Sequence, residues 1–376
     1  MRIGLVTETY PPEVNGVAAT LHRLARGLVD RGHGVHVVRP RRNRQDLGRH
    51  DDGIDEWAVP GLPLPGYPGL RFGLPATRRL YERWRALTPT VVHVATEGPL
   101  GWSAVQAARQ ADLPTTSSFH TQFHLYSSYY RIGVLRAAGI RYLRTIHNRT
   151  LRTFVPSDSM YEALRGHGFL NLQILGRGVD AHLFSPDRRS ADLRRQWGVA
   201  GDEIVALYVG RVAPEKNIPL AIAAYEAMRE RAPRLRLVVV GDGPMLRDLK
   251  RRHPGIHFSG LRRGEDLAAH YASGDLFLFP STTETFGNVV PEAMASGLLV
   301  LAFDYAAAAA LIQTNINGWA VPLGDADGYV DAARRLLDCQ GRWPVMRHNA
   351  RQTTTKMSWD VVVDEFEAHL ESVTQR

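Results

Sequence analysis

Short apolar runs alternate with amphipathic segments along the whole chain. Residues 2–7 form the first run, and further runs of four to six residues lie at 91–95, 204–209 and 276–279. Continuous apolar runs of this length are typical of strands buried on both faces of a parallel sheet. Amphipathic helical segments separate them, such as Val17 to Leu28. The pattern predicts an α/β fold built from βαβ units.

The βα pattern starts again about halfway along the chain. We therefore expect a first domain over residues 1–180 and a second over residues 187–357, each resembling a Rossmann-like βαβ unit. An amphipathic helix over residues 358–376 follows. Two such domains predict a ligand-binding cleft between them.

The amino-acid composition limits the classes of protein to which this chain can belong. The 376 residues are 44% hydrophobic and 22% charged, as in soluble globular proteins, and Cys339 is the only cysteine, which excludes a disulfide framework. Ile3 to Thr7 is too short for the apolar region of a signal peptide, and no apolar run approaches the ~20 residues of a membrane span. We expect a cytoplasmic protein that can touch a membrane without crossing it. The net charge of +8 favours an anionic partner.

The stretch from residue 275 to 297 is the richest in candidate chemistry. Its buried strand is followed by a polar loop with Glu284 and by a helix with Glu292 in its first turn. Asn288 is in position to cap this helix, and Pro291 is tolerated near its start. The N–H groups of a helix start attract anions. Two carboxylates beside an anion site predict a ligand with both phosphate and hydroxyl groups, such as a nucleotide sugar.

Cations and small residues follow other predicted strands. Arg211 and Lys216 lie on the loop after the strand at 204–209, where they can bind phosphate oxygens. His120 ends a strand at the carboxyl edge of the first sheet, where ligands bind in parallel sheets. Gly16 lets the backbone approach a ligand closely, but the first unit lacks G-x-G-x-x-G, which argues against a nicotinamide dinucleotide. Asp325 and Asp327 precede a helix and predict a capping turn rather than a metal site.

A basic segment without acidic residues runs from residue 113 to 157. Apolar residues recur beside its arginines at helical spacing. A basic amphipathic helix of this kind is typical of binding to an anionic membrane surface, and a solvated charged face is the alternative. Nucleic acid is disfavoured because no recognised binding motif accompanies the charge. The arginines are Arg131, Arg136, Arg141, Arg144, Arg149 and Arg152, and the apolar residues are Ile132, Leu135, Leu143 and Ile146.

A series of motifs in a fixed order resembles glycosyltransferase family 4, with its GT-B fold of two Rossmann-like domains facing across a cleft and a C-terminal helix that returns to the first domain. The motifs cover nearly the whole chain. They are Pro11-Pro12 with Asn15-Gly16-Val17, Ser118 to Thr121, Gly178-Val179-Asp180 with Phe184 and Pro186, Gly210-Arg211, Glu215 to Asn217, Gly241 to Pro244, and Glu284 to Glu292. Thr283 to Asn288 and Phe303 to Ala308 are similar to GDP-mannose-dependent mannosyltransferases and to sulfoquinovosyl- or glucosyl-diacylglycerol synthases.

The resemblance implies roles for residues of the second domain. Arg211 and Lys216 would hold the donor diphosphate and offset the charge of the leaving nucleotide. Glu292 would accept from the ribose hydroxyls and Glu284 from the sugar. Thr285 to Asn288 complete the donor-binding set, with the backbone N–H groups of Phe286, Gly287 and Asn288 directed to sugar and phosphate.

In the first domain, the resemblance implies that Gly16 meets the diphosphate and that His120 lies near the sugar C6 hydroxyl and the reacting carbon. Family members retain the anomeric configuration and need neither metal nor cofactor for the transfer. One departure is the unbroken alanine run from Ala306 to Ala310. In the family this loop contacts nucleotide or sugar, so donor choice is the property that it affects.

These inferences lead to one expected function and three alternatives. We expect a retaining glycosyltransferase that moves mannose from GDP-mannose to a lipid or lipid-linked acceptor, as a peripheral protein at the inner face of the cytoplasmic membrane. A UDP-sugar donor carrying glucose, glucuronate or sulfoquinovose, with diacylglycerol as acceptor, is the closest alternative. A sugar-nucleotide epimerase and a non-catalytic sugar-nucleotide-binding protein are the others.

Overall fold

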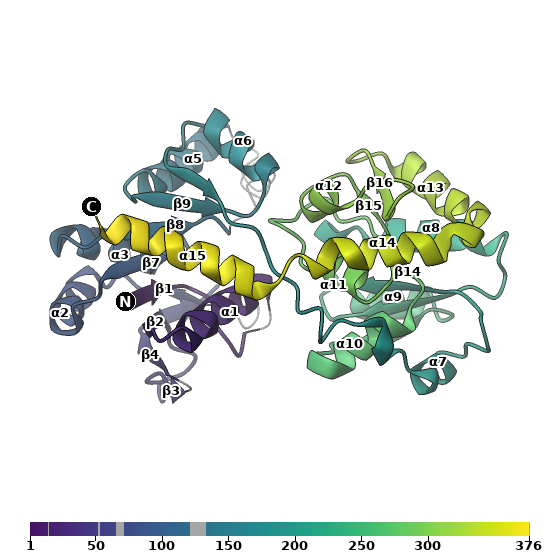
Figure 1. The fold of residues 1–376 in the computed structure, drawn as a ribbon, viewed down its shortest axis with the longest axis horizontal. Helices are drawn as coiled ribbons and strands as arrows, with labels where there is room; N and C mark the ends of the chain where they lie inside the picture. Colours follow the sequence, from purple (N-terminus) through teal and green to yellow (C-terminus); the bar gives the residue numbers. More distant parts are fainter. Residues whose placement is uncertain (14, 52, 65–70, 121–132, 376) are drawn as a thin grey trace. The chain divides into compact units, whose positions relative to one another are not determined.

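The computed structural model describes residues 1–375 except 14, 52, 65–70 and 121–132. These residues form two compact units (Figure 1). Unit 1 contains Met1–Gly178 and Trp359–Arg376, and unit 2 contains Val179–Ser358. The first boundary therefore falls two residues before the predicted residue 180, and the closing helix belongs to unit 1.

Unit 1 is built on an eight-stranded sheet in which all pairs are parallel except the last. Its order is β10 (Leu172–Ile174), β9 (Arg152–Val155), β8 (Thr115–Ser118), β7 (Val91–Val94), β1 (Arg2–Val6), β2 (Gly34–Pro40), β4 (Ile54–Val59) and β3 (His50–Asp51). A separate hairpin joins β5 (Gly61–Pro63) to β6 (Arg71–Gly73). The apolar runs at 2–7 and 91–95 predicted β1 and β7, whereas β4 and the short strands β3, β5 and β6 were not predicted.

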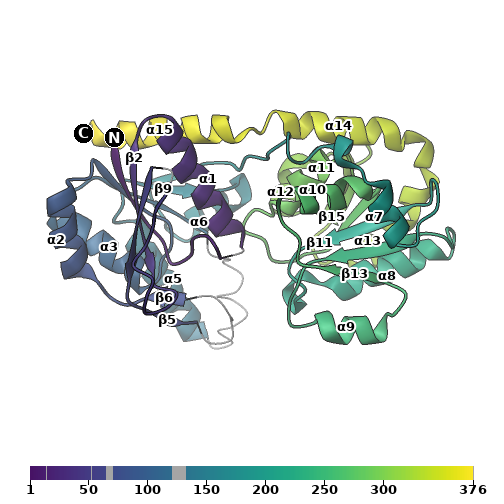
Figure 2. The same ribbon diagram turned by 90° about the horizontal axis from the view of Figure 1, so that it is seen from below.

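The helices of unit 1 are α1 (Gly16–Asp30), α2 (Thr77–Leu87), α3 (Pro99–Gln110), α5 (Gly133–His147), α6 (Asp158–Gly166) and α15 (Trp359–Thr374). Helix α15 lies beside α1 (Figure 2). A Cβ atom on Gly27 of α1 would lie 2.5 Å from a methyl group of Val363, so the absence of a side chain at Gly27 permits this close approach. Phe366 of α15 is fully buried, 5.2 Å from the ring of Phe154. The predicted amphipathic helix is thus a core element of unit 1.

Unit 2 has a six-stranded parallel sheet. Its order is β13 (His257–Gly260), β12 (Arg236–Val240), β11 (Val205–Val209), β14 (Leu276–Phe279), β15 (Leu299–Phe303) and β16 (Gly318–Val321). The predicted strand at 276–279 has the observed bounds of β14. Strand β16 was not predicted. It begins with a glycine, and its tryptophan and alanine are only half-buried, so it lacks the continuous buried apolar run of the neighbouring strands.

Helices cover both faces of this sheet, with α10, α11 and α14 on one side and α8 and α13 on the other (Figure 2). The α-helices are α7 (Ala191–Gln196), α8 (Ile218–Arg229), α9 (Leu246–Arg252), α10 (Gly264–Ser273), α11 (Val289–Ala295), α12 (Ala307–Leu311), α13 (Ala326–Asp338) and α14 (Trp343–Thr355). Three short 3₁₀ turns are η1 (Pro186–Arg188), η2 (Pro214–Lys216) and η3 (Gln340–Arg342). Asp325 caps α13 by accepting from the Gly328 amide at 2.9 Å, which confirms the predicted capping turn.

Each sheet contains one point where the strand order reverses. In unit 1 the chain runs outward in opposite directions from the neighbours β1 and β7, and in unit 2 from the neighbours β11 and β14. Ligands of open α/β sheets bind beside the carboxyl ends of strands at such a switch point. Functional side chains are therefore expected on the loops after β1, β7, β11 and β14.

Candidate active site

Two predicted site residues meet at the switch point of unit 2. Lys216 ends the turn η2 on the loop after β11, and Glu284 lies on the loop after β14. The Lys216 ammonium donates to Glu284 Oε1 at 2.5 Å and to the Thr283 carbonyl at 3.0 Å. The Ser281 hydroxyl donates to the same Glu284 oxygen at 2.7 Å. Because both charged side chains are about six-sevenths buried, this pair is held in a fixed position.

Local backbone geometry directs Lys216 to this position. Asn217 has φ +51° and ψ 40°, which ends the turn η2 and begins α8. Asparagine tolerates this left-handed conformation better than most residues. The lysine side chain at the preceding position thus lies against the loop after β14 instead of continuing along a helix surface.

Arg211 lies on the same loop as Lys216 but has a different partner. Its guanidinium contacts Glu215 at 3.3 Å, and 41% of its side chain is exposed. The phosphate-binding pair predicted from the sequence is therefore one mostly buried lysine and one accessible arginine. Arg211 can reorient toward an anion at the small cost of a surface ion pair.

Glu292 lies in the first turn of α11, as predicted. The Tyr271 hydroxyl donates to its Oε2 at 2.9 Å. Burial raises the pKa of Glu292 to about 7, although the Tyr271 hydrogen bond lowers it. Near neutral pH this carboxyl group therefore takes up and releases protons, unlike an exposed glutamate.

The loop between the two glutamates departs from one prediction. Asn288 already has helical dihedral angles, φ −53° and ψ −25°, and its side chain makes no capping hydrogen bond. The predicted Asn288 cap is wrong, because capping requires an extended backbone at that residue. Gly287 has φ +94°, and a Cβ there would lie 3.3 Å from Glu284 Cγ. Gly287 thus allows the loop to fold closely over Glu284, and Thr285 lies between them in sequence.

The alanine run is a helix rather than the predicted loop. Helix α12 spans Ala307–Leu311, and the Ala307 amide donates to the Phe286 carbonyl at 2.7 Å. The Tyr305 hydroxyl donates to the Glu284 carbonyl at 2.9 Å. Phe286 itself is buried in the core, so its part in the site is through its backbone. Through these two hydrogen bonds, the segment supports the loop that carries Glu284. The sequence motifs did not predict these contacts.

In unit 1, Gly16 is the exposed first residue of α1, and Asn15 caps this helix by accepting from the Ala18 amide at 2.8 Å. Helix α1 is 15 residues long and has a full macrodipole. Its start is compatible with the diphosphate contact that the resemblance implies for Gly16.

His120 follows β8 and is buried beside Arg177. Arg177 Nη2 donates to His120 Nδ1 at 3.1 Å. Burial, together with the positive charge of Arg177, holds the pKa of His120 well below its usual range. The imidazole is therefore neutral, and because Nδ1 accepts, its proton is on Nε2. His120 can serve as a hydrogen-bond donor through Nε2 rather than as a cation.

Sequence reasoning missed Glu8, which lies two residues after the end of β1 at the switch point of unit 1. Its Oε1 accepts from the Leu100 amide at 3.1 Å, and its Oε2 accepts from the Gly73 amide. Burial raises the pKa of Glu8 to about 7 despite these hydrogen bonds. A charged residue immediately after the first apolar run was the available signal.

The basic segment of residues 113–157 does not present the apolar face that was predicted to bind a membrane. Leu143 and Ile146 are fully buried in unit 1, so the part of the apolar row that the structure describes faces the core rather than a membrane. Arg152 is in β9, where it donates to Ser372 of α15, and Arg149 lies over the ring of Trp102 at 5.0 Å. The periodicity that predicted a membrane helix is that of an ordinary helix packed on a sheet.

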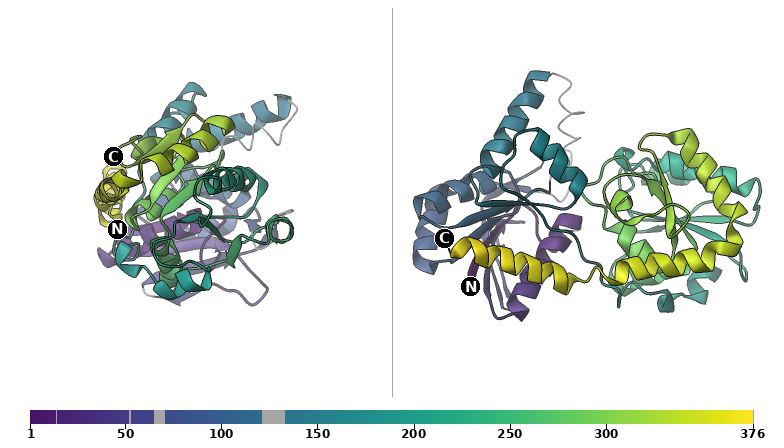
Figure 3. Two further views of the ribbon diagram at one scale, coloured as in Figure 1. Left: turned by 90° about the vertical axis from the view of Figure 1, so that its right-hand side faces the viewer. Right: turned by 45° about the horizontal axis from the view of Figure 1, so that its top comes forward.

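The exposed part of this segment is smaller than predicted. Arg141 and Arg144 are exposed on α5, next to α6 (Figure 3), and Arg144 donates to the His167 carbonyl at 3.2 Å. Arg131 and Ile132, and the side chains of Leu135 and Arg136, lie outside the described residues.

The described residues hold neither a cluster of metal ligands nor a membrane-spanning helix. No group of three or more histidine, cysteine, aspartate or glutamate side chains there is arranged to hold a metal ion. None of the helices that the structure describes combines the length and apolar character needed to cross a bilayer.

Comparisons with known proteins give related matches for both units. The family model described as "Glycosyltransferase Family 4" matches residues 14–183, and "Glycosyl transferases group 1" matches residues 203–339. The GDP-mannose-dependent alpha-mannosyltransferase of Mycobacterium tuberculosis is 34% identical over 100% of this chain and 98% of its own length. The alpha-monoglucosyldiacylglycerol synthase of Streptococcus pneumoniae is 29% identical over 80% of this chain and 71% of its own.

Solved structures share the fold. Sucrose-phosphate synthase from Thermosynechococcus elongatus has a TM-score of 0.79 at 20% identity, covering 99% of this chain and 98% of that one. The Anabaena protein HepE, in complex with UDP-glucose, has a TM-score of 0.78 at 18% identity, covering 99% of this chain and all of the other. This chain has the GT-B fold of these glycosyltransferases.

Proposed function

The chain belongs to glycosyltransferase family 4, and from this premise we propose that it transfers mannose from GDP-mannose to a lipid or lipid-linked acceptor. Similarity to a GDP-mannose-dependent enzyme over the full length of both chains supports the donor. Similarity to a diacylglycerol-modifying synthase supports a lipid acceptor. The relatives named above are a transferase and a synthase, which favours sugar transfer over epimerisation or binding alone.

The observation that carries the donor site is the contact between Lys216 and Glu284 at the switch point of unit 2. A cation and a carboxylate fixed 2.5 Å apart offer one group for a phosphate and one for sugar hydroxyls. We assign the diphosphate to Lys216 and Arg211, the sugar to Glu284, and the ribose to Glu292. Positive charge held in place before the reaction stabilises the departing nucleoside diphosphate without reorganisation.

We also propose that the transfer retains the anomeric configuration and needs no metal. Lys216 and Arg211 supply the positive charge that a divalent ion supplies in other transferases. His120 is neutral and donates through Nε2, which suits a sugar hydroxyl better than a phosphate.

A panel of donors tests this proposal. GDP-mannose and GDP should raise the melting temperature more than UDP-glucose, UDP-glucuronate and UDP do, and GDP-mannose should be hydrolysed or used at a higher kcat/KM than either UDP-sugar. NMR of the product with a lipid acceptor should show the α-anomer of the donor retained. Inversion of the anomer would contradict the retaining mechanism, and exclusive use of UDP-sugars would establish the second candidate.

That second candidate is a UDP-sugar-dependent diacylglycerol glycosyltransferase. Two observations favour it: the similarity to the glucosyldiacylglycerol synthase and the shared fold with HepE, which was crystallised with UDP-glucose. The same site residues would serve either donor, because diphosphate, ribose and hexose are common to both.

For the acceptor side, we propose peripheral binding at the anionic inner face of the cytoplasmic membrane. Arg141 and Arg144 are exposed on α5, and each basic residue near an anionic leaflet contributes about 1 kcal/mol. In vesicle sedimentation, Arg141→Glu with Arg144→Glu should abolish binding to anionic vesicles at low salt. The matched control exchanges Arg79 and Arg109, which are exposed in the same unit, for glutamate. Equal loss in both pairs would indicate net charge rather than a docking face.

A further inference from the structure

A second cluster of positive charge lies in unit 2, in a cavity of about 490 Å³ whose wall includes no residue of the donor set. Arg189, Arg347, Arg351 and His348 line it, together with Ser296 and small or apolar residues. No acidic residue is among the lining residues, all of which the structure describes. Cavities that bind small ligands in proteins span about 300–1,000 Å³.

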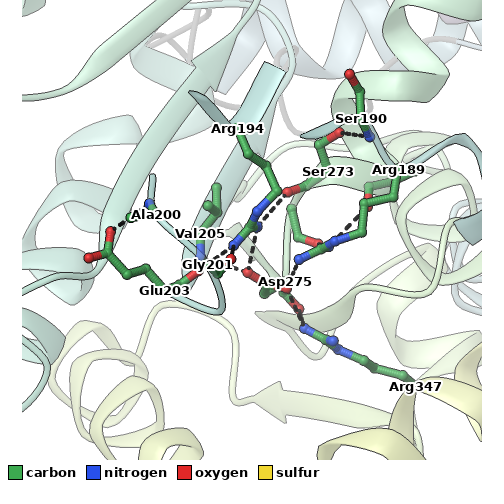
Figure 4. A network of polar contacts seen from close by, with 12 residues as sticks. Arg189, Ser190, Arg194, Ala200, Gly201, Glu203, Val205, Ser273, Asp275 and Arg347 are labelled. Atoms are coloured by element: carbon green, nitrogen blue, oxygen red, sulfur yellow. Dashed lines mark hydrogen bonds and ion pairs between the residues drawn. The ribbon is translucent and has the colours of Figure 1, made fainter. Parts of the chain in front are cut away.

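Two of the lining arginines, Arg189 and Arg347, are held in place by one buried carboxylate, which also binds Arg194. Asp275 accepts from Arg189 at 2.9 Å, from Arg194 at 3.1 Å and from Arg347 at 3.2 Å (Figure 4). The Val205 amide also donates to Asp275, at 2.8 Å. Three guanidinium groups around one carboxylate leave a surplus of positive charge.

The ends of two helices reduce this surplus without removing it. Arg189 donates to the carbonyls of Ala272 in the last turn of α10 and of Gly274 directly after it, and Arg351 donates to the Ala295 carbonyl at the end of α11. A helix end carries about half a negative charge. When Arg194 is counted, which contacts Asp275 but does not line the cavity, four guanidinium groups set against one carboxylate and two helix ends leave about two positive charges around the cavity.

Two residues of the lining carry buried hydrogen-bond donors that lack acceptors. Ser296 is 3% exposed, and its hydroxyl has no hydrogen-bond partner among the described residues. The Nε atom of Arg347 is also buried without a partner in the described part of the chain, and the hydrogen bonds of this arginine leave from Nη2. Buried donors of this kind are uncommon, because leaving them unpaired is costly.

We propose that this cavity binds a phosphate-bearing small molecule at a site separate from the sugar-donor residues. A surplus of about two charges matches a phosphate monoester or a diphosphate, and guanidinium groups match its oxygens. Apart from His348, the lining side chains include no aromatic ring on which a nucleobase could stack. The favoured class is thus an inorganic diphosphate or a sugar phosphate rather than a nucleotide.

The site has a direct structural connection to the donor residues. Helix α11 carries Glu292 in its first turn, and Ser296 and Gly297 follow its last residue. Ser296 follows Glu292 by four residues, about 6 Å along the helix axis, and its amide donates to the Glu292 carbonyl at 3.0 Å. A ligand held at Ser296 would therefore bind one helical turn away from a donor-binding carboxylate.

Isothermal titration with inorganic pyrophosphate tests the proposal. The host is the full chain with Lys216→Ala, Arg211→Ala and Glu284→Gln, which removes both donor-site cations so that the second site is measured alone. We expect saturable binding with a stoichiometry near one, weakened by added salt.

Two further substitutions in this host identify the cavity. His348→Glu puts a carboxylate at an exposed position beside two arginines and should weaken binding about tenfold or more. Ser296→Ala removes an unpaired hydroxyl and should weaken binding about tenfold while leaving the melting temperature of the free protein unchanged or higher. Gln340→Glu, an equal change of charge at an exposed position of unit 2 outside the cavity, should have no effect. Absence of binding in the host, or binding that survives both cavity substitutions, would overturn the proposal.

Discussion

Replacing Lys216 separates two roles that its position combines. In Lys216→Ala the Glu284 carboxylate keeps only the Ser281 hydroxyl as a side-chain partner among the contacts described above. Removing one member of a buried ion pair costs 3–5 kcal/mol. Because the two side chains retain 13% and 14% exposure, we expect about 3 kcal/mol, at the lower end. For a unit of this size, that corresponds to a fall in melting temperature of roughly 6–12 °C.

The same substitution also removes a contact to the donor diphosphate. A hydrogen bond to a charged group is worth about 1.5–3 kcal/mol, so kcat/KM should fall by roughly 10- to 150-fold beyond any effect of unfolding. Lys250→Ala, at an exposed position of unit 2, is the control for both measurements.

The double variant Lys216→Ala with Glu284→Gln distinguishes the two roles. A neutral amide no longer leaves a charge unpaired, so most of the lost melting temperature should return. Activity should remain low, because the cation for the diphosphate is still missing. Recovery of activity along with stability would refute the reasoning and would mean that Lys216 acts only by neutralising Glu284.

Three further predictions concern the same site. Arg211→Ala should lower kcat/KM by roughly 10- to 100-fold with little change in melting temperature, because Arg211 is 41% exposed and its ion pair is superficial; Arg247→Ala is the control, and equal losses in both would contradict the assignment. Because the folded-state pKa of Glu292 is raised from 4.5 to about 7, the wild type should lose stability as pH rises from 4.5 to 7. The melting temperature of Glu292→Gln should therefore exceed that of the wild type by a margin that grows over this interval and is constant above it, and a constant margin at all pH values would argue against a buried carboxyl group. Turnover should persist in excess chelator, and a loss reversed by magnesium or manganese would argue for metal-dependent transfer.

The sequence predicted several central strands, because a continuous apolar run favours a strand buried on both faces, but it did not predict β4 or β16. Leu276–Phe279 and Arg2–Val6 are examples of the predicted strands, and the C-terminal helix was predicted from its apolar face. Helical periodicity shows that a face is apolar but not what covers it. Leu143 and Ile146 were therefore assigned to a membrane although they pack in the core.

The sequence predicted the site residues individually, but it did not predict the contacts between them. The pairing of Lys216 with Glu284 depends on β11 and β14 being neighbours, although 67 residues of sequence separate the Lys216 ammonium from the Thr283 carbonyl that it also contacts. The helix over the alanine run and the missing Asn288 cap are set by the same packing. Glu8 and the Tyr271 contact to Glu292 also arise from tertiary structure, which spacing along the chain does not report.

The place of α15 in the sequence has a consequence for the synthesis of the protein. This helix supplies Val362, Phe366 and Leu370 to the core of unit 1, yet residues 179–358 separate it from the rest of that unit. At 5–20 residues per second, a ribosome needs roughly 10–40 s to make this intervening stretch. During this time unit 1 lacks α15, so the apolar side of α1 that α15 covers stays exposed while unit 2 is synthesised. A nascent chain stalled before residue 359 would carry a folded unit 2 and an unfinished unit 1 that chaperones can still recognise.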